Sequence, residues 1–210
     1  MVFSSHYPGL RRREKALLMG VLAAACCGWG EAHGQSLAYA VDPQHTRVHW
    51  EVLHFGTSTA RGRFDDVAVR LNFDRAGRRG DLFVEVRTAS VDTGVPPLDT
   101  ILRGEYFFAS KASPVAWFVS KRFRFDGDRL VAIDGELTVR DVPVALTLTA
   151  RRFACSPRPA DGAGSPTPAR EVCGGDFDGE LRRSDLGITY GLPFVADRVA
   201  IVVQVEAFAP

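Results

Sequence analysis

The sequence predicts an all-β protein, built as one antiparallel barrel or sandwich that carries a single short helix. The main observation is that apolar and polar residues alternate with period two along most of the chain, as in strands that cover one interior. Turn residues separate the alternating runs, and no strand–helix–strand rhythm occurs. The 210 residues suit one domain, with about eight or nine such strands.

Each alternating run predicts a strand with one apolar face. In the first run, Val48, Trp50 and Val52 alternate with polar side chains. Further runs lie at 67–73, 82–87, 142–148 and 199–205. The turns expected between the runs contain Ala76-Gly77, Asp126-Gly127-Asp128 and Asp141.

One segment departs from this pattern and predicts the helix. After Pro96-Pro97, apolar residues recur at helical spacing, at Leu98, Ile101, Leu102 and Tyr106. Gly104 lies within that spacing and is about 1 kcal/mol less favourable in a helix than alanine. We therefore expect one short helix, or a pair of helical turns, in the middle of the chain.

The first 34 residues have the pattern of a secretory signal peptide. Four basic residues at 11–15 precede an uncharged apolar run at 16–28, and small residues surround His33 before the expected cut after Gly34. The apolar run of about 13 residues is shorter than the roughly 20 that a membrane-spanning helix needs. We therefore expect export and a mature domain at 35–210. The alternatives are an uncleaved anchor and a lipoprotein cleaved at Cys26.

The charge balance excludes a strongly basic nucleic-acid binder, and no nucleic-acid partner is expected. The chain has 26 basic and 25 acidic side chains and 46% hydrophobic residues, which is an ordinary globular composition. Removal of residues 1–34 takes away four basic and two acidic groups, so the mature chain has a net charge of −1.

Two cysteines remain in the mature chain. Cys155 and Cys173 form an even pair in an exported protein, which predicts a disulfide; two free thiols are the alternative. Residues 156–170 between them are rich in proline and glycine, so we expect a long hairpin loop. A disulfide that closes such a loop contributes about 3 kcal/mol to stability.

The sequence contains no serine-hydrolase elbow, phosphate-binding loop or His-Glu-x-x-His zinc motif, so no catalytic residue and no metal are expected. His45 and His49 would be about 13 Å apart on a strand, and His54 has the opposite parity.

Phenylalanines are spread over several expected strands. An eight-stranded barrel can enclose one small ligand, so an interior of this kind favours an apolar ligand over chemistry. The alternative is a barrel packed solid.

A series of local motifs then resembles the YceI-like family of exported, lipocalin-like, polyisoprenoid-binding proteins. The motifs occur in the family's order over residues 38–208, as Tyr39-Ala40-Val41-Asp42-Pro43-Gln44-His45-Thr46, His54-Phe55-Gly56, Gly62-Arg63-Phe64, Ser90-Val91-Asp92-Thr93-Gly94, Asp99, Leu102-Arg103, Phe107-Phe108, Gly135-Glu136-Leu137-Thr138-Val139-Arg140 and Arg183-Ser184-Asp185-Leu186-Gly187. Asp141 departs from the family's usual glycine, and the insert at 155–173 is not part of the common pattern.

The resemblance implies an elongated, antiparallel, eight-stranded lipocalin-like barrel with one short helical insertion. It implies a periplasmic protein, with no cofactor, that holds a long isoprenoid, an isoprenoid quinone or a similar lipid without turnover, in transport, storage or stress. Transient contact with a membrane or a membrane protein and a homodimer are further expectations.

The ligand-binding residues follow from combining the resemblance with the physics of burial. We expect the tunnel to be lined by Phe55, Phe64, Phe107, Phe108, Phe118, Leu137 and Leu186. A polar headgroup would remain at the mouth, where Arg63 or Arg103 could pair with a diphosphate. Two other functions remain open. One is an enzyme on a lipid-like substrate with His54 or Asp99 as acid or base, and the other is an interaction module with a filled barrel.

Overall fold

The period-two runs form the wall of a closed barrel. A computed structural model describes residues 36–159 and 169–210; the expected signal peptide at 1–34, with Cys26, lies outside them. The strands are β1 Leu37–Val41, β2 Arg47–His54, β3 Ser58–Phe64, β4 Val67–Asp74, β5 Arg79–Arg87, β6 Val91–Asp92, β7 Val115–Asp126, β8 Arg129–Val139, β9 Val142–Pro159, β10 Ala169–Arg182 and β11 Val195–Phe208. The helices are α1 Pro96–Arg103 and the 3-10 turns η1 Thr88–Ser90 and η2 Arg183–Leu186.

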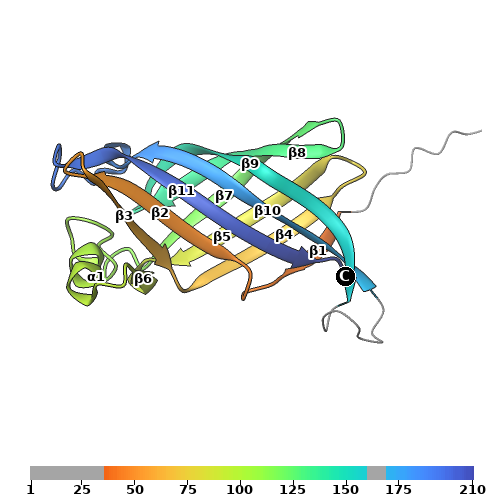
Figure 1. Cartoon of the computed structure of the whole chain (residues 1–210), viewed down its shortest axis with the longest axis horizontal. Coiled ribbons are helices and arrows are strands. Elements are labelled where there is room, and N and C mark those ends of the chain that lie inside the picture. Colours follow the sequence, from red (N-terminus) through yellow and green to blue (C-terminus); the bar gives the residue numbers. More distant parts are fainter. Residues whose placement is uncertain (1–35, 160–168) are drawn as a thin grey trace, which may run out of the picture. The chain divides into compact units, whose positions relative to one another are not determined.

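The barrel closes because β1 pairs on one side with β4 and on the other with β11. The ring runs β1-β4-β5-β7-β8-β9-β10-β11 and returns to β1, with all neighbours antiparallel. β2 continues along the same edge of β11, and β3 pairs with β2 (Figure 1). The expectation of an eight-stranded antiparallel barrel with one short helix is confirmed.

The alternating residues of each strand face the interior and the exterior of the barrel in turn. Val48, Trp50 and Val52 on β2 face the interior, while the residues between them face outward. On the outer face, Glu51 accepts a 2.8 Å hydrogen bond from Arg61 of β3. The inward apolar side chains therefore line the interior of the barrel.

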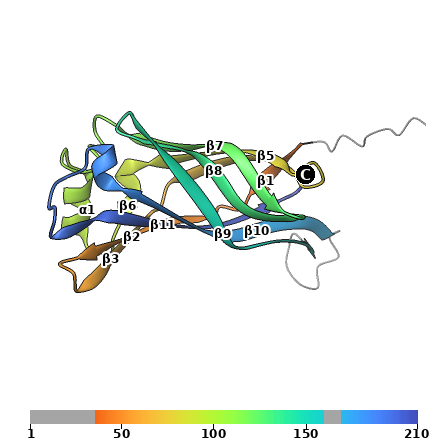
Figure 2. The same ribbon diagram turned by 90° about the horizontal axis from the view of Figure 1, so that it is seen from above.

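Helix α1 covers one end of this barrel. It starts at the expected prolines, and the N–H of Gly104 donates to the carbonyl of Ile101 where the helix ends. Leu98 and Leu102 point into the barrel. Figures 1 and 2 show α1 and β6 at the same end as the β2–β3 turn. No helix within the described residues is long and apolar enough to cross a bilayer.

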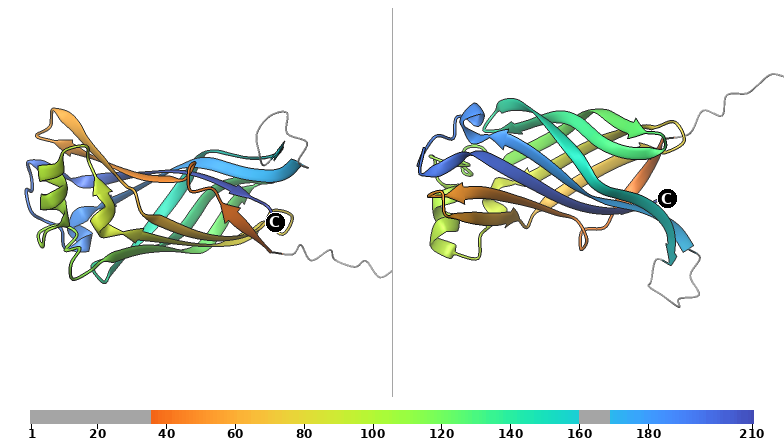
Figure 3. Two further views of the ribbon diagram at one scale, coloured as in Figure 1. Left: turned by 90° about the horizontal axis from the view of Figure 1, so that it is seen from below. Right: turned by 45° about the horizontal axis from the view of Figure 1, so that its top comes forward.

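The opposite end carries an extended β9–β10 hairpin (Figure 3). Cys155 and Cys173 face each other across it and form a disulfide, as expected. The expectation of a loop over all of 156–170 is wrong, because the ladder continues to the pair Pro159 and Ala169. Proline is tolerated there because the β8–β9 pairing ends at Thr149, which leaves the other edge of β9 without a described neighbour.

Candidate binding cavity

The barrel encloses a cavity of about 410 Å³, so its interior is not packed solid. The inward residues of the strands line it, together with Leu98 and Leu102 of α1. Thr46, His54 and Arg183 are the polar exceptions, and Trp50 adds an indole N–H. Among the described lining residues, only His54 is exposed, so the cavity reaches the surface beside it. A volume of this size, with an almost wholly apolar wall, suits a lipid or another apolar small molecule.

Most of the residues expected to line the tunnel do line this cavity. They come from β3, the segment after α1, β7, β8 and η2, and they are Phe64, Phe107, Phe108, Phe118, Leu137 and Leu186. His54 also faces it. Their part in binding a ligand stays a prediction, but the closed sheet brings these residues from distant parts of the chain onto one surface.

Phe55 is an exception, because it does not line the cavity. Its side chain is 58% exposed, and its ring stacks on Phe194 with 5.6 Å between the ring centroids. The turn between β2 and β3 begins at Phe55, which has a positive φ of 50° and is followed by Gly56. Phe55 also has the parity of the outward residues of β2, opposite to Val52 and His54, so the alternation itself places it outside.

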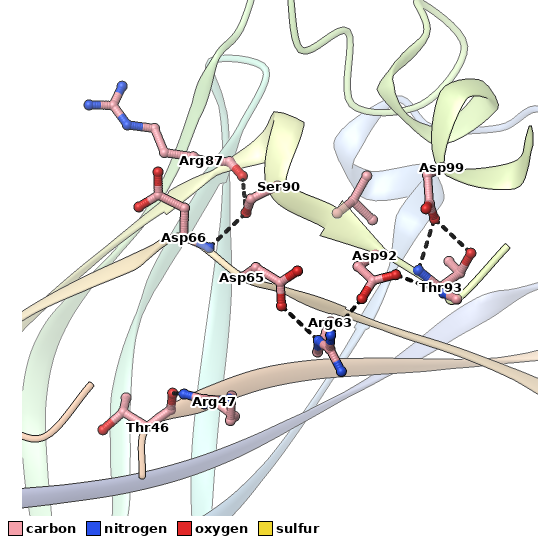
Figure 4. Close-up of polar contacts among 12 residues, drawn as sticks. Thr46, Arg47, Arg63, Asp65, Asp66, Arg87, Ser90, Asp92, Thr93 and Asp99 are labelled. Carbon is pink, nitrogen blue, oxygen red and sulfur yellow. Dashed lines mark hydrogen bonds and ion pairs between the residues drawn. The ribbon is translucent and has the colours of Figure 1, made fainter. Parts of the chain in front are cut away.

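Arg63 and Arg103 do not line the cavity. Both bond to residues of the segment 89–92 that precedes α1. The Arg63 guanidinium bridges Asp65 at 2.7 Å and Asp92 at 2.6 Å (Figure 4). Arg103 donates to the carbonyls of Ala89 and Val91. Both guanidinium groups are thus engaged within the fold, and pairing with a ligand headgroup stays a prediction.

Asp99 also has a local partner. Its carboxylate accepts hydrogen bonds from the backbone N–H and the hydroxyl of Thr93, at 2.8 and 2.7 Å (Figure 4). These bonds hold the pKa of Asp99 below its usual value. Asp99 does not line the cavity and His54 does, so the structure does not bring the two candidate acid–base residues onto one surface.

This arrangement predicts a pH dependence of stability. Because the pKa of Asp99 is lower in the folded protein than in the unfolded chain, its stabilising effect is present above about pH 4 and is lost as the pH falls through the folded value. We expect Asp99→Asn to lower the free energy of unfolding at pH 7 and to lose this effect in acid. Urea unfolding from pH 7 to pH 2.5 measures it. Asp141→Asn, at an exposed turn, is the control, and an equal loss at every pH would contradict the prediction.

Trp50 was not expected as a site residue. Its side chain is 8% exposed, lines the cavity and packs among Val52, Val91 and Leu102. The indole lies flat over Gly62 of β3, where a Cβ would come within 2.3 Å of Trp50 Cζ2. The sequence indicates that Trp50 faces the interior, because it alternates in step with Val48 and Val52. The same alternation holds for every inward residue, so it does not show whether Trp50 packs in the core or contacts a ligand.

Arg183 is the second residue that sequence reasoning missed. Its side chain is 6% exposed and lies in the cavity wall where η2 begins. It donates four hydrogen bonds of 2.8–2.9 Å to the backbone carbonyls of Ile188, Tyr190, Val195 and Ala196. Burial lowers the pKa of this guanidinium, and the nearby Asp197 carboxylate partly offsets the shift. Arg183 therefore fixes the backbone of residues 188–196, just before and at the start of β11.

An exposed aromatic rim lies at the α1 end of the barrel. We define it as Phe55, Tyr106, Tyr190 and Phe194, each of which is more than half exposed. Tyr106 stacks on Tyr190 with 5.1 Å between centroids, as Phe55 does on Phe194. The rim is adjacent in sequence to His54 and Phe107, which line the cavity. Aromatic rings gathered at such a place suit contact with a lipid–water boundary.

Two groups of potential metal ligands occur in the described part of the chain. One consists of Asp42, His45 and Glu206, and in it His45 contacts Asp42 at 2.8 Å. Glu206 is also paired with Arg158 at 2.8 Å. The other is Cys155, Glu171 and Cys173, whose two sulfurs form the disulfide. Neither group offers a set of ligands free of these partners.

Comparison with known proteins agrees with this geometry. The sequence model of the YceI-like domain matches residues 39–207. The chain is 28% identical over 194 residues to Protein YceI of Salmonella arizonae, and the match covers 92% of this chain and 97% of the relative. Protein YceI of Salmonella dublin is equally similar.

Solved structures share the barrel. BcnA of Burkholderia cenocepacia superposes with a TM-score of 0.62 at 22% identity, over 80% of this chain and 99% of BcnA. The YceI protein of Campylobacter jejuni gives 0.58 at 26% identity, over 74% and 88% of the two chains. A polyisoprenoid-binding domain from Saccharophagus degradans gives 0.57 at 16% identity, over 83% and 99%.

Proposed function

This chain belongs to the YceI-like family, and from that premise we propose that it is a binding protein that holds a long-chain isoprenoid or a similar amphiphilic lipid inside its barrel. The observation that carries the proposal is the cavity of about 410 Å³ with an almost wholly apolar wall. Each CH₂ group moved from water into such a cavity contributes about 0.8 kcal/mol. A prenyl chain is therefore held by apolar packing.

Binding without turnover suits the chemistry of the wall. Beside its apolar side chains, the cavity offers the Thr46 hydroxyl, the Trp50 indole N–H, one exposed imidazole at His54 and one guanidinium that is already bonded to four carbonyls. An acid–base reaction needs groups that converge on one reacting atom. The solved polyisoprenoid-binding domain from Saccharophagus degradans has the same fold and supports this choice of ligand class.

The proposal includes export to the periplasm through the signal peptide at 1–34, and a role in lipid transport, storage or stress. A soluble carrier protects an apolar chain from water on its way between membranes. The disulfide between Cys155 and Cys173 is in keeping with an oxidising compartment.

Native mass spectrometry tests the proposal. The full-length gene is expressed, and the exported protein is purified without detergent and weighed before and after solvent extraction. We expect an extra mass that extracts as a prenyl lipid, and a polypeptide that begins after Gly34. A bare polypeptide, also after incubation with isoprenoid quinones and prenyl phosphates, would contradict the proposal. The same spectra test the predicted homodimer.

We place loading at the aromatic rim, through transient contact with a membrane. The double variant Phe55→Ser/Phe194→Ser removes two exposed rings whose burial in lipid is favourable, so we expect at least about 5-fold weaker retention on vesicles. Sedimentation with vesicles of phosphatidylethanolamine and phosphatidylglycerol measures it. The control, Leu37→Ser/Val119→Ser, removes exposed apolar residues away from the rim. Equal retention of both variants would contradict a role for the rim.

A further inference from the structure

The cavity wall contains one buried hydrogen-bond donor without a partner. The indole Nε1 of Trp50 is buried and makes no hydrogen bond within the described residues. Buried polar groups in folded proteins are nearly always bonded, and an unmade bond is costly. The other unpartnered buried side-chain atom among the described residues, Ser110 Oγ, does not line the cavity. The Trp50 N–H is therefore a hydrogen-bond donor of the cavity wall that is available to a bound molecule.

The surroundings of Trp50 are poorly suited to a water molecule. A buried water needs two to four polar partners. Trp50 belongs to a buried apolar cluster with Val52, Val91 and Leu102. The indole also lies close over the backbone of Gly62, which holds the ring in place. An acceptor for this N–H must therefore come from a bound molecule whose remainder is apolar.

The depth of Trp50 restricts the charge of that acceptor. Trp50 lies four residues along β2 from His54, or roughly 13 Å below the exposed end of the cavity. Arg183, the one cation in the described wall, bonds to Val195, which pairs with His54 at that end. A phosphate at the depth of Trp50 would be buried among apolar groups without a counter-charge. A neutral oxygen meets no such penalty.

We propose that Trp50 donates a hydrogen bond to a carbonyl oxygen of the bound lipid, which makes it the residue through which the cavity prefers carbonyl-bearing lipids over prenyl hydrocarbons and prenyl diphosphates. This inference rests on the proposed function and names a specificity-determining residue of the cavity. The aliphatic part of the lipid packs against the apolar wall, and the carbonyl decides which lipid is preferred.

The test is the variant Trp50→Phe, which keeps an aromatic ring and removes the N–H. The probes are ubiquinone with two prenyl units, squalene and geranylgeranyl diphosphate, each titrated in native mass spectrometry. We expect Trp50→Phe to weaken ubiquinone about 2- to 13-fold, the range of one net hydrogen bond. Squalene has no oxygen to accept the N–H, so it is expected to lose less affinity than ubiquinone in this variant, and the difference between the two losses measures the hydrogen bond.

Trp117→Phe is the matched control. Trp117 lies on β7 between Ala116 and Phe118, both of which line the cavity, so its own side chain faces outward. It also leaves Trp50 as the sole tryptophan of 35–210. In this variant, labelled with ¹⁵N, the remaining indole proton is expected to shift downfield on addition of ubiquinone and to stay in place with squalene.

The outcomes separate the two proposals. Squalene and ubiquinone that bind equally well to the wild type and to Trp50→Phe would overturn the carbonyl contact and leave lipid binding standing. An equal loss of affinity for all three probes in Trp50→Phe would mean that Trp50 only packs against the ligand, and this result would also overturn the carbonyl contact. Preferred binding of the diphosphate would overturn the neutral acceptor. Failure of every probe to bind would overturn lipid binding and this inference together.

Discussion

Replacing Ala60 with tryptophan is expected to weaken lipid binding about 50-fold while the barrel remains folded. Ala60 lies on β3 opposite Val52, lines the cavity and is only partly buried, so space adjoins its methyl group. An indole at this position would fill part of that space. If it displaces about three methylene groups of the ligand, each contributing about 0.8 kcal/mol, the affinity falls about 50-fold. Ligand titration by native mass spectrometry measures the change.

The matched control is Ala68→Trp. Ala68 is exposed on the outer face of β4, between Val67 and Val69, and does not line the cavity. The same side chain is thus added outside the wall, and lipid binding is expected to be unchanged. Urea unfolding checks that both variants fold. Full binding by a folded Ala60→Trp protein would mean that the lipid does not occupy the cavity.

Arg183→Met is expected to lower the free energy of unfolding by about 3–5 kcal/mol. Methionine has a similar length but cannot donate, so four backbone carbonyls between Ile188 and Ala196 would lose the hydrogen bonds that the guanidinium makes. Those carbonyls lie just before β11 and at its start, and Ile188 and Val195 among them line the apolar cavity wall, where water replaces the lost bonds poorly. Equilibrium unfolding in urea measures the loss.

The neighbouring arginine provides the control. Arg182 ends β10 with an exposed side chain, so Arg182→Met is expected to change stability by no more than about 0.5 kcal/mol. Arg183→Lys keeps the charge but not the planar fork of donors, and an intermediate loss is expected. Equal stability of the Arg182 and Arg183 variants would contradict an organising role for Arg183.

The architecture followed from local pattern because a strand repeats every two residues. The alternation at Val48, Trp50 and Val52, and its equivalents elsewhere, placed one face of each strand inside. The turn at Asp126-Gly127-Asp128 and the helix after Pro96-Pro97 also lie where expected. The resemblance added strand number and closure, which period two alone leaves open between barrel and sandwich.

The functional residues were only partly predictable. Parity places Phe64 and Phe118 in the wall, and it also places Phe55, which alternates with the inward Val52 and His54, outside. The expectation that Phe55 lines the tunnel therefore went against the alternation. The sequence did not indicate that Arg63 and Arg103 already have partners in the fold. Arg63 pairs with Asp92, which is distant in sequence, and Arg103 bonds to the backbone carbonyl of Ala89. A one-dimensional pattern does not contain such contacts.

The strands β2, β4, β5 and β11, the first part of β9, the helix, the turns and the pair Cys155–Cys173 could be predicted from the sequence, because each depends on near neighbours or on a count of residue types. Three features required the folded structure: the free space inside the wall, the burial of Arg183 against four carbonyls, and the Trp50 N–H that has no partner among the described residues. These features depend on how side chains from β2, β3, β10 and β11 fill a shared volume. Residues of the right period can fill such a volume or leave it open, and that difference separates a solid core from a binding protein.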